Sequence, residues 1–141
     1  MSLYLDTSVV VPLFVSEGGS DRVLRWIAEQ TDALMLSDLT VTEFHAVISR
    51  LVRQGVIDAS HAEEIREQFD LWREAATEPL ENLPADIRAA GQLVRSPLPK
   101  LLTADATHLA TCRRLGMTLV TADLDLHSIA DREGVECGRP N

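Results

Sequence analysis

The chain contains 141 residues, of which 45% are hydrophobic and 25% are charged, as is typical of one globular domain spanning residues 1–141. No apolar run approaches the roughly 20 residues of a membrane helix, and no signal peptide precedes the first apolar run, so we expect a cytoplasmic protein outside the membrane. The formal net charge is −9, from 13 basic and 22 acidic residues, which disfavours a generic nucleic-acid-binding protein with a basic face. Cations held in an acidic pocket would reverse that potential locally.

Short apolar runs alternate with longer segments of helical periodicity, and this alternation is typical of an α/β fold. In the first half of the chain, strands are expected at residues 3–5 and 33–36. Helices are expected from residue 8, at residues 20–30 and 41–53, and in a segment capped by Asp58. The last of these helices carries Ile65, Phe69 and Trp72 on one face, so that face is expected to be buried.

The second half of the chain continues the same alternation. A weak strand is expected at residues 78–81, helices at 84–94 and 104–115, a strand at 118–121, then a short helix and a strand at 135–137. Because parallel strands joined by helices need crossover connections, helices should cover both faces of the sheet. The pattern predicts a three-layer α/β/α sandwich around a parallel sheet of four to five strands.

Four acidic residues stand where strands end or helices begin. Asp6 and Asp123 follow short apolar runs, and Glu43 and Asp105 open helical segments. Ligands of open parallel sheets bind beyond the carboxyl ends of the strands, where distant loops meet. Four carboxylates gathered there would repel one another by roughly 4 kcal/mol per close pair at an intermediate dielectric, and divalent cations would relieve this repulsion. Asp6 is the strongest candidate, because the hydroxyl residues beside it could cap the following helix instead.

Each of the other acids also has a local structural explanation, because Asp and Glu are favoured at helix N-termini. Thr40 and Glu43 have the spacing of a capping box, which alone would account for both residues. Asp105 could be a first-turn acid behind a Thr103 cap, and Asp123 could cap the helix that it precedes. Taken singly, these positions therefore do not decide between capping and metal binding.

Four fragments considered together are more specific than any single acid. They are Leu-Asp-Thr-Ser at residues 5–8, Thr-Glu at 42–43, Ala-Asp-Ala-Thr-His-Leu-Ala at 104–110 and Thr-Ala-Asp-Leu-Asp at 121–125. In this order and spacing, and over nearly the whole chain, the sequence resembles the PIN-domain ribonucleases, specifically the VapC toxins of bacterial and archaeal toxin–antitoxin pairs. The resemblance implies a PIN-like fold and a metal-dependent endoribonuclease toxin of a type II system.

The same resemblance implies roles for individual residues and partners. Asp6, Glu43, Asp105 and Asp123 would form the catalytic acidic cluster that holds Mg²⁺, with Mn²⁺ as a substitute, and Ser8 and Thr121 would be supporting hydroxyls. The implied partners are an RNA substrate, a cognate antitoxin and a second copy of the chain, in a homodimer and in toxin–antitoxin hetero-oligomers. Carboxylates suit this chemistry because Mg²⁺ prefers oxygen ligands. Water would attack a phosphodiester in line, leaving 5′-phosphate and 3′-hydroxyl products.

Other polar residues have two possible interpretations each. Asp125 is an auxiliary metal ligand or a solvated first-turn acid, and His108 shares a helical face with Asp105, where it would contact phosphate or pack internally. The basic residues considered for an RNA path are Arg50, Arg53, Lys100, Arg113 and Arg114, although arginines near helix ends also complement the helix dipole. Two cysteines, Cys112 and Cys137, show no disulfide or zinc spacing and are expected in the core.

Two other functions remain open at this stage. One is an aspartate-based phosphotransferase, since an Asp after the first strand can accept a phosphoryl group, but Ser8 stands where such enzymes carry a second Asp. Lys100 is also the only lysine available to bind phosphate. The other is a regulatory protein-binding module whose acidic metal pocket receives a basic peptide.

Overall fold

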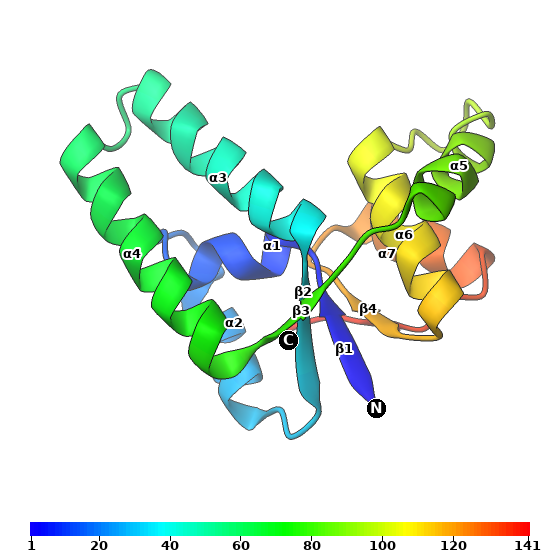
Figure 1. Cartoon of the computed structure of the whole chain (residues 1–141), viewed down its shortest axis with the longest axis horizontal. Coiled ribbons are helices and arrows are strands. Elements are labelled where there is room, and N and C mark those ends of the chain that lie inside the picture. Colours follow the sequence, from blue (N-terminus) through cyan, green and yellow to red (C-terminus); the bar gives the residue numbers. More distant parts are fainter.

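The computed structural model describes residues 1–141 as a five-stranded parallel sheet between two layers of helices (Figure 1). The elements in chain order are β1 (Ser2–Leu5), α1 (Thr7–Val10), the 3₁₀ helix η1 (Val11–Leu13), α2 (Ser20–Glu29), β2 (Ala33–Ser37), α3 (Asp38–Arg53), α4 (Ala59–Ala76), β3 (Glu78–Leu80), α5 (Pro84–Leu93), α6 (Thr103–Leu115), β4 (Thr118–Val120), α7 (Leu124–Arg132) and β5 (Cys137–Gly138). The predicted fold class is confirmed.

The order of strands across the sheet reverses between β1 and β4. The sheet runs β3-β2-β1-β4-β5, so the chain moves outward from β1 through β2 to β3 and then returns to the other side of β1. Leu5 at the end of β1 pairs with Val120 at the end of β4. Such a reversal of strand order is where open α/β sheets bind ligands. The residues that follow Leu5 and Val120 therefore meet at this point.

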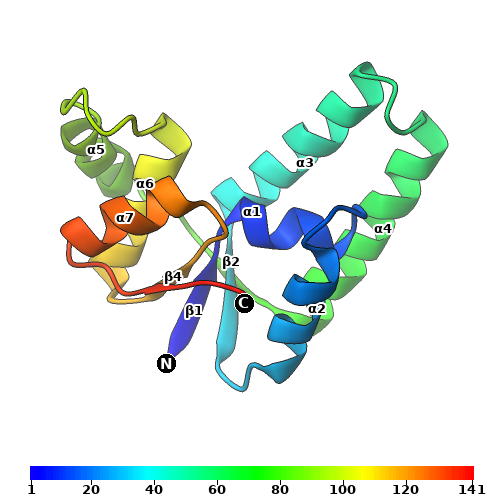
Figure 2. The same ribbon diagram turned by 180° about the vertical axis from the view of Figure 1, so that it is seen from behind.

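Alternation along the strands divides the core into two clusters. Leu3 and Leu5 of β1 face the layer of α1 to α4, whereas Tyr4 between them faces the layer of α6 and α7. Figures 1 and 2 show these layers on opposite sides of the sheet, with α3 and α4 paired as a long hairpin. Successive side chains of a strand point to opposite faces, so one short strand can serve both cores.

The first core is rich in aromatic rings, which join α3 and α4 to the segment after η1. Phe44 and Phe69 stack with ring centroids 3.9 Å apart, and Phe14 meets the edge of each ring at 5.6 Å. Trp72 packs against Phe14 with a centroid separation of 5.5 Å. Ile65, Phe69 and Trp72 thus face inward, as their spacing predicts.

Two helix starts and one strand differ from the sequence-based expectation. Helix α3 begins at Asp38, because the Ser37 hydroxyl caps it by accepting a hydrogen bond from the Thr40 N–H at 3.1 Å. The Thr40–Glu43 capping box, one of the two interpretations of these residues, therefore does not form. Helix α6 also begins without the Thr103 cap that was considered for it, since Thr103 is already helical. Strand β5 lies at 137–138 rather than 135–137. None of the helices has the length and apolarity needed to cross a bilayer.

Candidate metal and active site

The carboxyl ends of the two central strands position the first acidic residue. Asp6 follows β1, and its N–H donates to the carbonyl of Val120 in β4 at 3.0 Å. Asp6 is only 4% exposed, yet its carboxylate does not cap α1. Instead, Oδ2 of Asp6 accepts hydrogen bonds from Ser8 Oγ at 2.7 Å and Thr121 Oγ1 at 2.8 Å. These two hydroxyls, singled out from the sequence, therefore fix the carboxylate between β1 and β4.

Glu43 approaches Asp6 from the first turns of α3. Its Oε1 accepts a hydrogen bond from Thr7 Oγ1 at 2.8 Å and forms a second, very short contact with Nε2 of His108. Burial alone would raise the pKa of Glu43, but the hydrogen bond and charge of His108, together with the Thr7 hydroxyl, lower it below its ordinary value. The Glu43 carboxylate is thus held in its ionised form and in one orientation.

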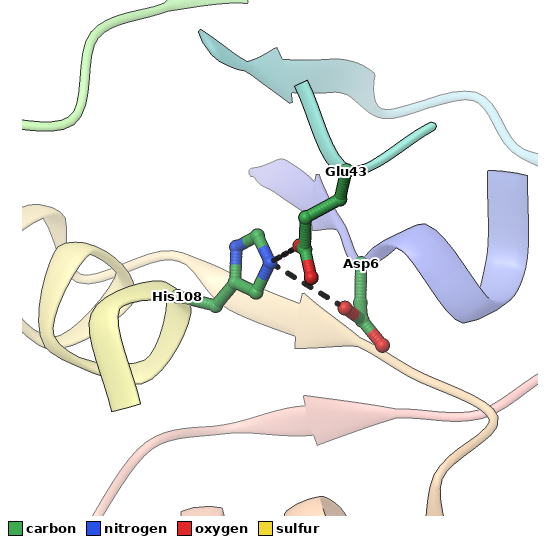
Figure 3. A group of neighbouring side chains, drawn as sticks. All are labelled: Asp6, Glu43 and His108. Atoms are coloured by element: carbon green, nitrogen blue, oxygen red, sulfur yellow. Dashed lines mark hydrogen bonds and ion pairs between the residues drawn. The ribbon is translucent and has the colours of Figure 1, made fainter. Parts of the chain in front are cut away.

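His108 lies between the two carboxylates and is completely buried. Figure 3 shows Nε2 of His108 pointing toward Glu43 and toward Asp6, whose Oδ1 is 3.6 Å away. On the other side of the ring, Nδ1 lies 2.5 Å from the Tyr4 hydroxyl. Because no part of the ring reaches the surface, His108 cannot touch phosphate from this position. Its ring is packed internally, as one of the two interpretations from the sequence held, but it also contacts Asp6 and Glu43, which that interpretation did not foresee.

Tyr4 connects His108 to the interior of the second helical layer. Its hydroxyl donates to Ser37 Oγ at 2.8 Å and accepts from Asn82 Nδ2 at 3.2 Å. Asn82 in turn donates to Thr111 Oγ1 at 3.0 Å. Sequence reasoning missed Tyr4 and Asn82, although a tyrosine within an otherwise aliphatic first strand signals a buried hydroxyl that needs partners.

Asp105 and Asp123 face the same region from α6 and α7. Burial and the charge of Asp6, with smaller contributions from Asp123 and Glu43, raise the pKa of Asp105 to about 6, although His108 opposes this shift. Asp105 therefore experiences the field of all three other acids. Of the four predicted acids, Asp6 and Glu43 thus lie together beside His108, and Asp105 and Asp123 lie within electrostatic reach of them.

Asp123 has a structural role in addition to its place beside the acids. It caps α7, because Oδ1 accepts hydrogen bonds from the N–H groups of Asp125 at 2.9 Å and Leu126 at 3.3 Å. Asp105, Asp123 and the exposed Asp125 line one pocket of about 190 Å³, together with Lys100. Capping and membership of the acidic cluster are thus compatible for Asp123.

The donor set and its charge fit a divalent cation. Ligand atoms of Asp6, Glu43 and His108 lie within 4.8 Å of one another. Protein donors bind Oδ2 of Asp6 and Oε1 of Glu43, which leaves Oδ1 and Oε2 without a hydrogen-bond donor within bonding distance. Burial, and after it the negative charges of Asp6, Asp123 and Glu43, raise the pKa of Asp105 to about 6. Carboxylate oxygens in such surroundings suit Mg²⁺ or Mn²⁺.

Two arginines considered for an RNA path have carboxylate partners far from the acids. Arg114 binds the buried Asp86 through two contacts of 2.7 and 2.9 Å, and Arg113 lies 3.3 Å from Glu133. Burial alone would raise the pKa of Asp86, but hydrogen bonds from Arg114 and neighbouring donors lower it. Both arginines stand eight or nine positions after Asp105 on α6, about 12 Å along the helix axis. Their main contacts are structural.

Comparison with known proteins agrees with this architecture. Residues 3–132 match the model of the PIN domain family. Among solved structures, VapC20 of Mycobacterium tuberculosis, a toxin that cleaves the sarcin–ricin loop, superposes with a TM-score of 0.73 and 18% identity over 90% of this chain and 94% of that one. FitAcB of Neisseria gonorrhoeae gives 0.72 and 19%, covering 98% and 97% of the two chains.

A third solved structure, DNA-bound VapBC of Salmonella typhimurium, gives a TM-score of 0.75 at 14% identity over 100% of this chain and 99% of that one. No curated protein matches the sequence. The parallel sheet with acids at its central carboxyl ends defines an α/β/α domain with a candidate metal centre. The match over most of its length then shows that this chain belongs to the PIN domain family.

Proposed function

We propose that this protein is a metal-dependent endoribonuclease toxin of a type II toxin–antitoxin system. The observation that carries the proposal is that ligand atoms of Asp6, Glu43 and His108 lie within 4.8 Å of one another at the carboxyl end of β1. Asp105 and Asp123 lie within electrostatic reach of this group, since the charges of Asp6, Asp123 and Glu43 add to burial in raising the pKa of Asp105 to about 6. Membership of the PIN domain family supports nuclease activity. Cleavage of the sarcin–ricin loop by the neighbour VapC20 of M. tuberculosis supports RNA as the substrate class.

The four acids would hold Mg²⁺, or Mn²⁺ in its place, with Asp125 as an auxiliary residue. The bound cation would supply Lewis acidity toward a phosphodiester and its attacking water. The protein contributes orientation, because Ser8 and Thr121 fix Asp6 while Thr7 and His108 fix Glu43. Substitution of residues that orient metal ligands in this way commonly lowers metal affinity or activity by about 10–100-fold.

The partner we propose is a cognate antitoxin with a basic segment that approaches the acids. The resemblance to the VapC toxins of toxin–antitoxin pairs and the structural likeness to VapBC of Salmonella typhimurium support this partner, and the net charge of −9 would steer a basic peptide toward this surface. We further propose a homodimer in the free state, a hetero-oligomer with the antitoxin, and a location in the cytoplasm. Light scattering of the free protein tests the dimer, because a monomer at micromolar concentration would contradict it.

Cleavage of pooled cellular RNA by the purified, antitoxin-free protein tests the activity. Reactions with Mg²⁺, Mn²⁺ or a chelator should give cuts only with metal, and the products should carry 5′-phosphate and 3′-hydroxyl ends. The Asp6→Asn variant serves as the control, since it removes the charge while keeping acceptor oxygen for Ser8 and Thr121. Lack of cleavage by a folded protein that still binds metal would favour the protein-binding module instead.

A further inference from the structure

A second pocket borders the acidic cluster on the side of α1 and α2. It has a volume of about 310 Å³, and its lining includes Ser8, Ala122, Arg22, Arg139 and one carboxylate, Glu17. Ser8 joins the pocket to the acids, because its hydroxyl donates to Asp6 at 2.7 Å and accepts from the Ala122 N–H at 3.0 Å. The pocket therefore begins directly beside the Asp6 carboxylate.

Two distant parts of the chain bring the arginines to this pocket. Arg22 lies in the first turn of α2, and Arg139 follows β5. Figure 2 shows the segment after β5 running back across the sheet toward the α2 side, where the C-terminus ends. Both side chains are exposed, and neither takes part in any of the ion pairs of the structure. Their guanidinium donors are free to bind an anion.

The charged residues that line this pocket are mostly basic, whereas the chain as a whole is acidic. In a chain with net charge −9, two unpaired arginines share one cavity that contains a single acid. On the other side of the acids, the pocket of Asp105 and Asp123 contains Lys100, the only lysine of the chain. Basic groups thus flank the acidic cluster on two sides, as a phosphodiester backbone crossing it would require.

We propose that Arg22 and Arg139 form a phosphate-binding subsite that holds the RNA backbone on the α1–α2 side of the scissile bond. Guanidinium groups suit this role because their planar donors match phosphate oxygens. An acidic peptide is a weaker candidate ligand, since the pocket opens onto Ser8 and the proposed catalytic acids rather than onto a separate surface. The inference rests on the proposed ribonuclease function.

The salt dependence of RNA binding tests the subsite. The probe is a labelled single-stranded oligouridylate of roughly 12 nucleotides, bound by Asp6→Asn protein so that no cleavage occurs. Adding Arg22→Gln and Arg139→Gln should reduce the slope of log K against log salt by about 1.4, since each phosphate contact on a single strand contributes about 0.7. If the two proteins bind RNA equally at 1 M salt, this difference in slope makes the double variant bind roughly 25-fold more weakly than its parent at 0.1 M salt.

Arg88→Gln is the matched control, because Arg88 is an exposed arginine on α5 that forms no ion pair and lies across the sheet from the pocket. It should leave the slope unchanged. An equal slope for the Arg22/Arg139 double variant would overturn the subsite, even if the wild type cleaves RNA. If the wild type neither binds nor cleaves RNA with metal, the proposed function itself fails. Loss of antitoxin binding alone, with RNA binding intact, would assign the pocket to an acidic peptide and overturn the RNA subsite.

Discussion

The two halves of the acidic cluster are built differently. Asp6 and Glu43 each accept two hydrogen bonds from side chains that are themselves held in place, and the pKa of Glu43 is lowered. Asp105 receives no such hydrogen bond and has its pKa raised to about 6, and Asp123 accepts hydrogen bonds only from the backbone of its own helix. One half is therefore organised before any cation binds, whereas the other half carries unrelieved repulsion.

This difference assigns separate physical roles to the two halves. The Asp6–Glu43 half sets the position of the ligand oxygens, because Ser8, Thr121, Thr7 and His108 restrict their orientation. The Asp105–Asp123 half favours cation binding through its excess negative charge. Substitutions of Asp6 and Glu43 should therefore disturb ligand geometry and activity most. Substitutions of Asp105 and Asp123 should change the pH dependence of stability.

The largest expected effect follows from Asp6→Asn. The amide keeps an acceptor for Ser8 and Thr121 but loses the charge at the centre of the cluster. We expect metal-dependent cleavage to fall by at least about a thousand-fold, which corresponds to about 4 kcal/mol of transition-state stabilisation. Single-turnover cleavage measures the loss, and thermal unfolding of the metal-free variant should differ little from wild type. Substantial activity in a folded variant would remove Asp6 from the proposed catalytic cluster.

His108→Ala tests whether the organised half depends on its buried imidazole. The change removes one hydrogen-bond partner each from Glu43 and from the Tyr4 hydroxyl and opens a buried cavity, so we expect a loss of about 2–4 kcal/mol in unfolding free energy. Metal affinity should weaken by about 10–100-fold. Calorimetric titration with Mn²⁺ measures this affinity at a temperature where the variant is folded.

His108→Gln is the matched variant, since its amide can still donate toward Glu43. Partial recovery of Mn²⁺ affinity would support positioning of the carboxylate by this hydrogen bond. Equal affinities for wild type, Ala and Gln proteins would show that Glu43 does not need His108 to bind the ion.

The pH dependence of stability tests the other half, in metal-free protein with chelator present. The Asp105 pKa of about 6 is above its value in the unfolded chain, so the folded state holds this proton more tightly between about pH 4 and 6. Stability from this group is therefore greatest below pH 4, falls as the pH rises through 6, and stays lower above that. The lowered pKa of Glu43 acts in the opposite direction, but only below its unfolded value near 4.3.

Asp105→Asn isolates this contribution from the titration of other groups. It should raise the melting temperature at pH 7 more than at pH 5, and the difference between variant and wild type should grow between about pH 4 and 6 and level off above 6. A difference that does not vary with pH would show that Asp105 does not titrate under the influence of its neighbours.

Local patterns were sufficient for the fold class but not for the strand order or for the contacts of the site. Short apolar runs separated by amphipathic helices predicted the parallel sheet and both helical layers, because periodicity depends on nearby residues alone. The Thr40–Glu43 capping box does not form, because the Thr40 hydroxyl donates to the Leu5 carbonyl at 3.0 Å and Glu43 turns to Thr7 and His108. These partners lie more than 30 positions away in sequence, so spacing along one helix could not identify them.

The predicted site residues illustrate the same division. Ser8 and Thr121, for which the resemblance implied supporting roles, both donate hydrogen bonds to Asp6, since both hydroxyls follow strands that are neighbours in the sheet. The arginine pair of the second pocket was missed, because Arg22 and Arg139 stand 117 positions apart in unrelated fragments. Only the return of the chain after β5 brings them together.

The smallest expected effect concerns Asp125, which lies just beyond the acidic cluster. Its side chain is exposed on the first turn of α7, and no hydrogen bond ties its carboxylate to the other acids. Asp125→Asn should therefore change the cleavage rate by no more than about threefold, the size of a screened surface charge effect. Asp123→Asn is the informative partner, since asparagine can still cap α7 and any loss beyond tenfold would come from the missing charge. Equal losses in the two variants would place Asp125 in the cluster and extend the repulsive half to three carboxylates.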